Sequence, residues 1–217
     1  MPLVYKKSID KGSFFGVWDI TESYMELVSE LSLSDEEFKI LNGFKSESRK
    51  KQWLSYRVLI KQLVNLDMFF EMTYDEHGKP FLLKPDYHLS VSHSGNYSAV
   101  ILSKNCFVGI DIENIHPKIK KIVSKFLNEK ELKNIKLSER SDDLEKIYVY
   151  WCAKEALYKL YGKKKVSLRE HIHINPFSYK ETGNINGEII SKQFSLHYKL
   201  QYFKISNYML SYLTKKK

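Results

Sequence analysis

The chain has 217 residues, of which 43% are hydrophobic and 28% are charged, and its formal net charge is +9. This composition excludes a disordered chain, and no apolar run resembles a membrane span or a signal peptide, so we expect a cytoplasmic protein without membrane contact. The two cysteines form neither a disulfide framework nor a zinc spacing, and the excess of positive charge favours an anionic partner such as nucleic acid, a phosphorylated cofactor or an acidic protein.

The first 65 residues are predicted to form a strand and then three helices. The strand is the aromatic and β-branched segment 13–20, and the longest helix is predicted over 47–65 by apolar residues at helical spacing. Two shorter helices each begin with a capping box, in which glutamate follows serine by three residues: Ser23 with Glu26, and Ser34 with Glu37.

Basic side chains are concentrated on the long helix. Lys50, Arg57 and Lys61 fall on one side of it, because spacings of seven and four residues are close to whole turns. These side chains, together with Arg49, either form a solvated basic face or line a phosphate site.

Two predicted strands, 70–74 and 88–91, flank a turn that contains Gly78-Lys79-Pro80. At the end of the second strand lies the segment 92–96, Ser-His-Ser-Gly-Asn, whose small hydroxyls, histidine and glycine could present several donors to an anion. An ordinary turn has the same composition, so this segment alone does not choose between the two interpretations.

The segment 108–113, Val-Gly-Ile-Asp-Ile-Glu, is predicted to be the second strand of a hairpin with 97–102. Because side chains two apart on a strand point the same way, Asp111 and Glu113 share one face. Such a pair can bind Mg²⁺, which prefers carboxylate oxygens and substrate phosphates, or it can be the solvated outer face of an ordinary strand.

The second half begins with predicted helices over 118–127 and after Asn128, and continues with a longer helix over 143–161. On the long helix, Trp151, Glu155 and Lys159 follow one another at four-residue spacing and lie on one side. Glu155 and Lys159 form either a routine surface pair or a metal ligand or general base with a phosphate-binding lysine.

The remaining residues are predicted to form antiparallel strands over 171–174, 188–190, 194–198 and 208–213, around turns such as 182–184. Two histidines of the first of these strands share a face, but no third metal ligand is evident. The halves share a layout of strand, helices and strands. We therefore expect an α+β fold of two similar lobes, 1–105 and 106–217, each a small mainly antiparallel sheet packed with helices and related by a pseudo-two-fold axis.

Taken in chain order, the motifs Gly78-Lys79-Pro80, Ser92-His93-Ser94, Gly-x-Asp-x-Glu over 109–113 and Trp-x-x-Lys-Glu-Ala-x-x-Lys over 151–159 resemble those of the 4′-phosphopantetheinyl transferases. The likeness is to the longer, two-lobed type, and its motifs run from Gly78 to Lys159. One departure is Ser90, which stands where many members carry asparagine.

The resemblance implies a role for each matching residue. Asp111, Glu113 and Glu155 correspond to the Mg²⁺ ligands, with Asp111, Glu155 and Lys159 as the catalytic group. Contacts to coenzyme A are implied for Lys79, Pro80, Ser92, His93 and Lys159, and for Arg49, Lys50 and Arg57 of the basic helix. Glu131 corresponds to an acidic residue near the site.

The implied reaction is attack by a serine of an acidic apo carrier protein on the β-phosphate of coenzyme A, with release of 3′,5′-ADP. In it, Lys159 and His93 add fixed positive charge, and Glu155 accepts the serine proton. The resemblance thus implies a monomeric transferase that does not bind nucleic acid. The alternatives are another Mg²⁺-dependent phosphate-handling enzyme and a basic nucleic-acid-binding module, whose affinity would fall steeply with salt.

Overall fold

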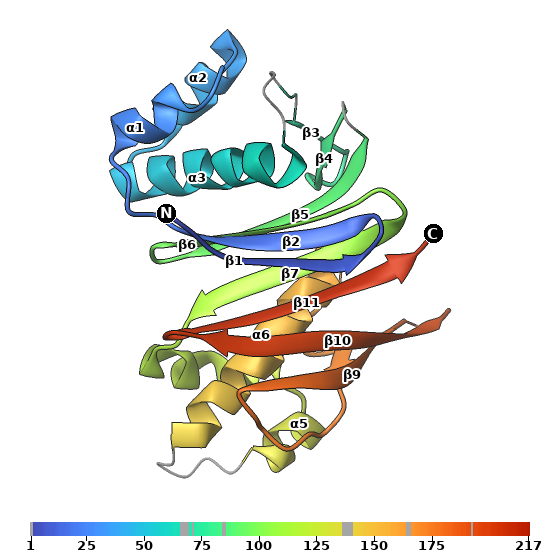
Figure 1. Cartoon of the computed structure of the whole chain (residues 1–217). Coiled ribbons are helices and arrows are strands. Elements are labelled where there is room, and N and C mark those ends of the chain that lie inside the picture. The colour runs from blue at the N-terminus through green and yellow to red at the C-terminus, as the bar shows by residue number, and fades with distance from the viewer. Residues whose placement is uncertain are drawn as a thin grey trace.

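The computed structural model describes residues 2–65, 70, 72–83, 86–135, 141–163, 166–191 and 193–217. Two antiparallel sheets lie against each other, and helices cover the outer face of each sheet (Figure 1). The expected α+β class, with two lobes each made of an antiparallel sheet and helices, is confirmed.

The first sheet has the strand order β1-β2-β6-β5-β4-β3. Its strands are β1 (Leu3–Asp10), β2 (Ser13–Asp19), β3 (Met72–Tyr74), β4 (Pro80–Leu82), β5 (Tyr87–Ser94) and β6 (Tyr97–Ser103). The second sheet has the order β7-β11-β10-β9-β8. Its strands are β7 (Cys106–Asn114), β8 (Ile172–Ile174), β9 (Thr182–Ile190), β10 (Ser195–Ile205) and β11 (Tyr208–Lys216).

Helices of the first lobe are α1 (Tyr24–Ser29), α2 (Asp35–Gly43) and α3 (Glu47–Val64), and both predicted capping boxes are formed. The apolar side of α3 packs on the first sheet through side chains such as Leu59 and Leu63. Asn65 ends this helix in the left-handed conformation that asparagine tolerates.

The second lobe contains a 3₁₀ helix η1 (Pro117–Ile122) and the helices α4 (Val123–Phe126), α5 (Glu129–Asn134) and α6 (Ser141–Tyr161). The long helix α6 packs on the second sheet with fully buried Ile147, Ala153 and Leu157. Among the described residues, no helix is both long enough and apolar enough to span a membrane.

A separate apolar cluster joins the two sheets. Phe15 and Ile101 of the first sheet meet Ile110, Ile112 and other side chains of the second, and all four are fully buried. The molecule is therefore layered as helices, sheet, sheet and helices. The first sheet ends at Ser103 and the second begins at Cys106, so only two residues connect β6 with β7.

Several sequence-based predictions are wrong in detail. The segment 97–102 does not form a hairpin with 108–113, because β6 pairs with β2 and β5 while β7 pairs with β11. The basic helix predicted over 118–127 is divided into η1 and α4, and the turn predicted at 182–184 belongs to β9. The strand β1 was not predicted. One residue of the predicted strand 70–74, Glu71, lies outside the described residues.

Candidate active site at the junction of the two lobes

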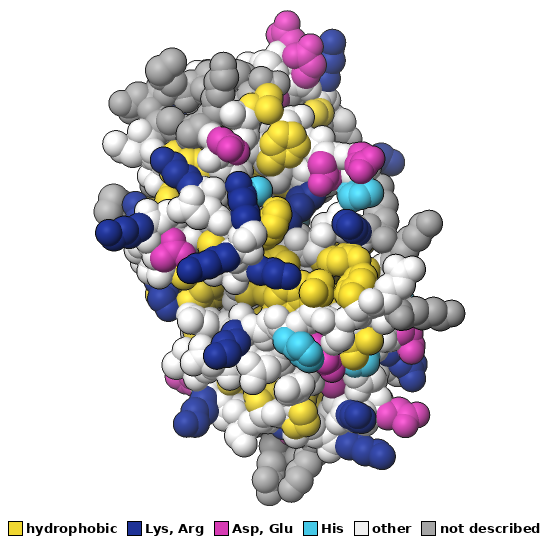
Figure 2. All heavy atoms as spheres, turned by 90° about the vertical axis from the view of Figure 1, so that its right-hand side faces the viewer, with side chains coloured by type: hydrophobic (Ala, Val, Ile, Leu, Met, Phe, Trp, Pro, Cys, Tyr) yellow, Lys and Arg dark blue, Asp and Glu magenta, His cyan; other side chains and the backbone are white. Residues whose placement is uncertain are grey.

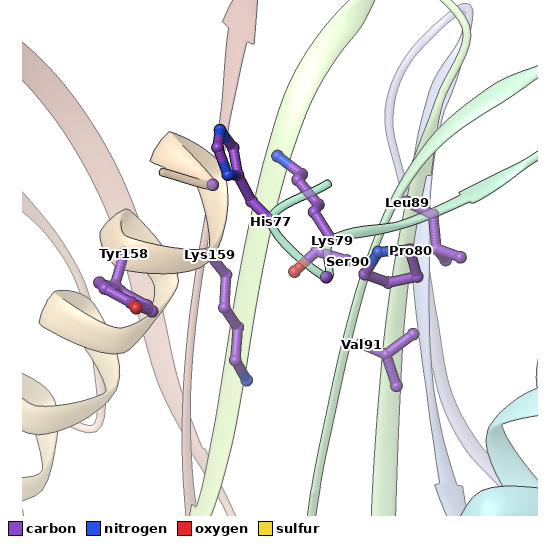
Figure 3. A pocket seen from close by; sticks show the side chains of 10 residues that line it. His77, Lys79, Pro80, Leu89, Ser90, Val91, Tyr158 and Lys159 are labelled. Atoms are coloured by element: carbon purple, nitrogen blue, oxygen red, sulfur yellow. The ribbon is translucent and has the colours of Figure 1, made fainter. Parts of the chain in front are cut away.

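A pocket of about 260 Å³ lies between the β3–β4 turn, β5 and the C-terminal end of α6. Figure 3 shows Lys159 reaching from α6 along β7, while His77, Lys79 and Pro80 come from the turn on the other side. The predicted motifs Gly78-Lys79-Pro80 and Lys159, separated by about eighty residues, thus line one cavity.

The β3–β4 turn is held in shape by its own first residue. The Asp75 carboxylate accepts hydrogen bonds from the backbone N–H groups of His77 and Lys79 at 2.9 and 2.8 Å. Gly78 has φ +84°, a conformation that glycine adopts without steric cost. The Lys79 ammonium donates to the carbonyl of Leu160 at 2.9 Å, so it crosses to the end of α6. Burial lowers the pKa of Lys79.

The strand β7 presents Gly109, Asp111 and Glu113 to α6, because its alternate residues, Ile110 and Ile112, fill the apolar cluster between the sheets. Asp111 is only 2% exposed, so the interpretation of this face as solvated is wrong. Gly109 permits the close approach: a Cβ atom built there would lie 2.1 Å from the carbonyl oxygen of Ala156.

Replacing Gly109 with alanine is therefore expected to push α6 away from β7 and lower the free energy of unfolding by about 1–3 kcal/mol. Urea denaturation measures this effect. Gly43→Ala is the control, because nothing lies within 4 Å of the position of its added Cβ. Equal stability of the two variants would contradict the tight packing of α6 on β7.

Asp111 is contacted from both lobes. Its Oδ1 accepts hydrogen bonds from the Ser92 hydroxyl of β5 and from the Lys159 ammonium of α6, both at 2.7 Å. Its Oδ2 is buried and has no hydrogen-bond partner among the described residues, since the neighbouring Cys152 thiol donates to the carbonyl of Met209. A buried carboxylate oxygen without a partner is costly, and it is a suitable ligand for a hard cation.

Two further carboxyl groups lie near Asp111. Burial, and then the charge of Asp111, raise the pKa of Glu113. The same two causes raise the pKa of Glu155 to about 7, although Lys159 opposes the shift. The three acids therefore repel one another in a partly desolvated place.

These observations fit a divalent cation. The donor set is made of carboxylates, one buried oxygen has no hydrogen-bond partner among the residues that the structure describes, and a positive ion would relieve the repulsion among the acids. However, no three His, Cys, Asp or Glu side chains in the described part of the chain are gathered tightly enough to enclose an ion. The acids form an electrostatic cluster, without the closed geometry of a preformed metal cage.

His93 lies on β5 with its ring against the guanidinium of Arg49 from α3. Burial, and then the charges of Arg49 and Lys159, lower the pKa of His93 to about 4. With this pKa the ring is neutral near pH 7, which does not support the expectation that His93 adds fixed positive charge. The charge at this position comes from Arg49.

Two other basic residues of α3, Arg57 and Lys50, make their contacts away from the site. The Arg57 guanidinium is 2% exposed, bonds Glu37 at 3.3 Å and stacks on Trp53. The Lys50 ammonium lies over the ring of Tyr24. The predicted contacts of Arg57 and Lys50 with coenzyme A are thus not supported, because both side chains are directed toward α1 and α2.

Glu131 is also not at the site. Its carboxylate is buried, accepts from the backbone N–H of Ile174 and forms a 2.7 Å ion pair with the fully buried Lys154. Lys154 additionally donates to the carbonyl oxygens of Phe126, Leu168 and Ile172. The lysine of the Trp-x-x-Lys-Glu motif is therefore structural, since it ties α6 to the end of α4, to the segment before β8 and to β8 itself.

Sequence reasoning missed several residues that line the pocket: His77, Leu89, Val91, Tyr158 and Gly162. Adjacency to a motif or to a helix end was the available signal for three of them: His77 adjoins Gly78, Tyr158 adjoins Lys159, and Gly162 follows the end of α6. Trp151, assigned no role, donates to Glu113 at 3.5 Å.

The face of the molecule to the right in Figure 1 is rich in positive charge. Figure 2 shows many Lys and Arg side chains gathered there around exposed hydrophobic ones, with fewer acidic side chains. A surface of this kind attracts anionic ligands and acidic proteins.

The fold and the site define a two-lobed α+β protein with clustered acids and a lysine-lined pocket between its lobes. Residues 107–213 match the 4′-phosphopantetheinyl transferase superfamily. The second half of the chain, from β7 to β11, is therefore similar to the domain of this superfamily.

Three curated relatives share part of the chain. A Synechocystis sp. protein provisionally named 4′-phosphopantetheinyl transferase slr0495 is 30% identical over 60% of this chain and 57% of its own length. The 4′-phosphopantetheinyl transferase AcpT of Salmonella typhimurium is 32% identical over 52% of this chain and 60% of its own. The 4′-phosphopantetheinyl transferase psf-1 of Bacillus pumilus is 36% identical over 40% of this chain and 37% of its own. The chain thus spans 57% of the length of the Synechocystis relative and 60% of the length of the Salmonella relative.

Proposed function

We propose that this protein transfers the 4′-phosphopantetheine group of coenzyme A to a serine of an apo carrier protein, with Mg²⁺ as the cofactor. The observation that carries the proposal is Asp111, a buried acid with an unpartnered oxygen that contacts Lys159 beside the pocket formed by Gly78-Lys79-Pro80. The superfamily domain over 107–213 supports it.

In the proposed complex, the pocket residues bind coenzyme A. Lys79 and Lys159 line the pocket and supply positive charge to the phosphates of coenzyme A. Pro80 and Val91 form an apolar part of the pocket wall. Arg49 adds charge next to His93, whose neutral ring donates or accepts one hydrogen bond. Ser92 is proposed to act through Asp111, because its hydroxyl donates a hydrogen bond to that carboxylate.

Asp111, Glu113 and Glu155 would hold Mg²⁺, which when bound supplies charge neutralisation to the diphosphate. In the reaction, the carrier serine oxygen forms a bond to the β-phosphorus, and the bond from that phosphorus to the bridging oxygen breaks, so that 3′,5′-ADP leaves. Lys159 stabilises the charge that gathers on the phosphate oxygens. Glu155 accepts the serine proton directly or through water.

The carrier protein is proposed to be acidic, since the formal net charge of +9 and the basic face would speed and orient its approach. We further propose that the protein acts as a monomer in the cytoplasm and does not use nucleic acid as a ligand.

The direct test is to incubate the protein with coenzyme A, Mg²⁺ and apo carriers from fatty-acid, polyketide and non-ribosomal peptide synthesis, and to measure the mass of each intact carrier. We expect one carrier to gain the mass of one phosphopantetheine group, and EDTA to prevent the gain. If no carrier is modified while the protein binds nucleic acid in a salt-dependent manner, the binding-module alternative is favoured.

A further inference from the structure

Two strands of different sheets run side by side at the junction of the lobes, and serine side chains connect them. β5 belongs to the first sheet, and β7 is the edge strand of the second. The Ser90 hydroxyl accepts the backbone N–H of Ile110, and the Ser94 hydroxyl accepts that of Asn114. The two hydroxyls thus accept backbone N–H groups of β7 that the carbonyl groups of a neighbouring strand would otherwise accept.

Serines of β5 also donate to the acids of β7. Ser92 donates to Asp111 and Ser94 donates to Glu113, each at 2.7 Å and each across 19 positions in the chain. Because alternate residues of a strand share a face, the two contacts repeat in register. The Glu113 carboxylate is thereby held on one oxygen by Ser94 and on the other by Trp151 of α6 at 3.5 Å.

The turn that follows Ser94 is held from several directions. The carbonyl of Gly95 accepts from the Gln52 side chain of α3, and the carbonyl of Asn96 accepts the backbone N–H of Ile20. The N–H of Asn96 donates to the hydroxyl of Tyr208, whose ring stacks on Tyr97 at 4.2 Å. Contacts from both lobes thus fix the backbone next to Ser94.

We propose that Ser94 is a positioning residue for Glu113: its hydroxyl orients this carboxylate for the divalent cation, so the contact between the lobes sets the affinity of the site for metal. The proposal rests on the proposed function only in requiring a cation at Asp111 and Glu113. Outer hydrogen-bond partners of metal ligands contribute about 10–100-fold to metal affinity in other proteins.

The test compares Ser94→Ala with Ser94→Thr, which keeps the hydroxyl, and with Ser98→Ala. Ser98 is a matched control, because it is a buried serine of the adjacent strand whose hydroxyl contacts Ser55 and no acid. Binding of Mn²⁺ to each protein in the presence of coenzyme A is followed by electron paramagnetic resonance, and thermal unfolding is measured in parallel without metal.

We expect Ser94→Ala to weaken Mn²⁺ binding by about 10–100-fold, and Ser94→Thr and Ser98→Ala to stay within about threefold of the unsubstituted chain. The Mg²⁺ concentration for half-maximal transfer should rise in the same proportion for Ser94→Ala. Equal Mn²⁺ affinity of Ser94→Ala and Ser98→Ala, with the unsubstituted chain binding the ion, would overturn this inference alone. Failure of the unsubstituted chain to bind Mn²⁺ would overturn both the inference and the metal site.

Discussion

Asp111→Asn is expected to lower the efficiency of carrier modification by about a thousandfold or more, with the fold intact. Asparagine has the same shape and keeps an oxygen that can accept from Ser92 and Lys159, so the contacts between the lobes persist. The negative charge that would hold the cation is lost, and charge stabilisation by a bound metal ion contributes several kcal/mol to such reactions.

The measurement is the initial rate of carrier modification by mass spectrometry, over a range of Mg²⁺ concentrations. Glu145→Gln is the control, because Glu145 forms a 2.8 Å ion pair with Lys204 in the same lobe and away from the pocket. If Asp111→Asn keeps the activity of Glu145→Gln, Asp111 is not a ligand of the essential metal.

Lys154→Met is expected to lower the free energy of unfolding by about 3–5 kcal/mol, the range found when one partner of a buried ion pair is removed. The substitution leaves the Glu131 carboxylate buried without its cation, and it removes the ammonium that donates to the carbonyl oxygens of Phe126, Leu168 and Ile172. Since Lys154 does not line the pocket, we expect the substitution to lower the free energy of unfolding while the affinity for coenzyme A changes less.

Chemical denaturation of Lys154→Met and of Lys130→Met provides the comparison, because Lys130 is an exposed lysine adjacent to Glu131. Adding Glu131→Gln to Lys154→Met should recover part of the loss, since it removes the unpaired charge while keeping an acceptor for the N–H of Ile174. A Lys154→Met variant as stable as Lys130→Met would show that the buried pair contributes nothing to the fold.

Local structure was largely predictable from the sequence. The capping boxes at Ser23 and Ser34 form because their hydrogen bonds join residues three apart, so no distant segment is needed. The alternation of Ile110, Asp111, Ile112 and Glu113 on a strand was predictable for the same reason. The motifs also identified four of the residues that line the pocket, Gly78, Lys79, Pro80 and Lys159.

Predictions that depended on distant partners were less successful. The basic residues of α3 looked equivalent in the sequence, yet Arg49 contacts His93 whereas Arg57 pairs with Glu37. Glu131 was expected near the site because the resemblance implied an acidic residue there, but its partner is Lys154. The predicted hairpin of β6 with β7 was wrong. A short connection allows the next strand either to pair with the strand before it or to begin a second sheet, and the sequence does not distinguish these outcomes.

The sequence by itself determined the helices, most strands and the set of chemical groups, because propensity, capping and periodicity act over a few residues. Only the tertiary structure decided which groups meet. It buried Asp111 and placed it between Ser92 and Lys159, and it directed Arg57 and Glu131 into the cores of separate lobes. The physical reason is that ion pairing and desolvation depend on distances through space, which spacing along the chain does not specify.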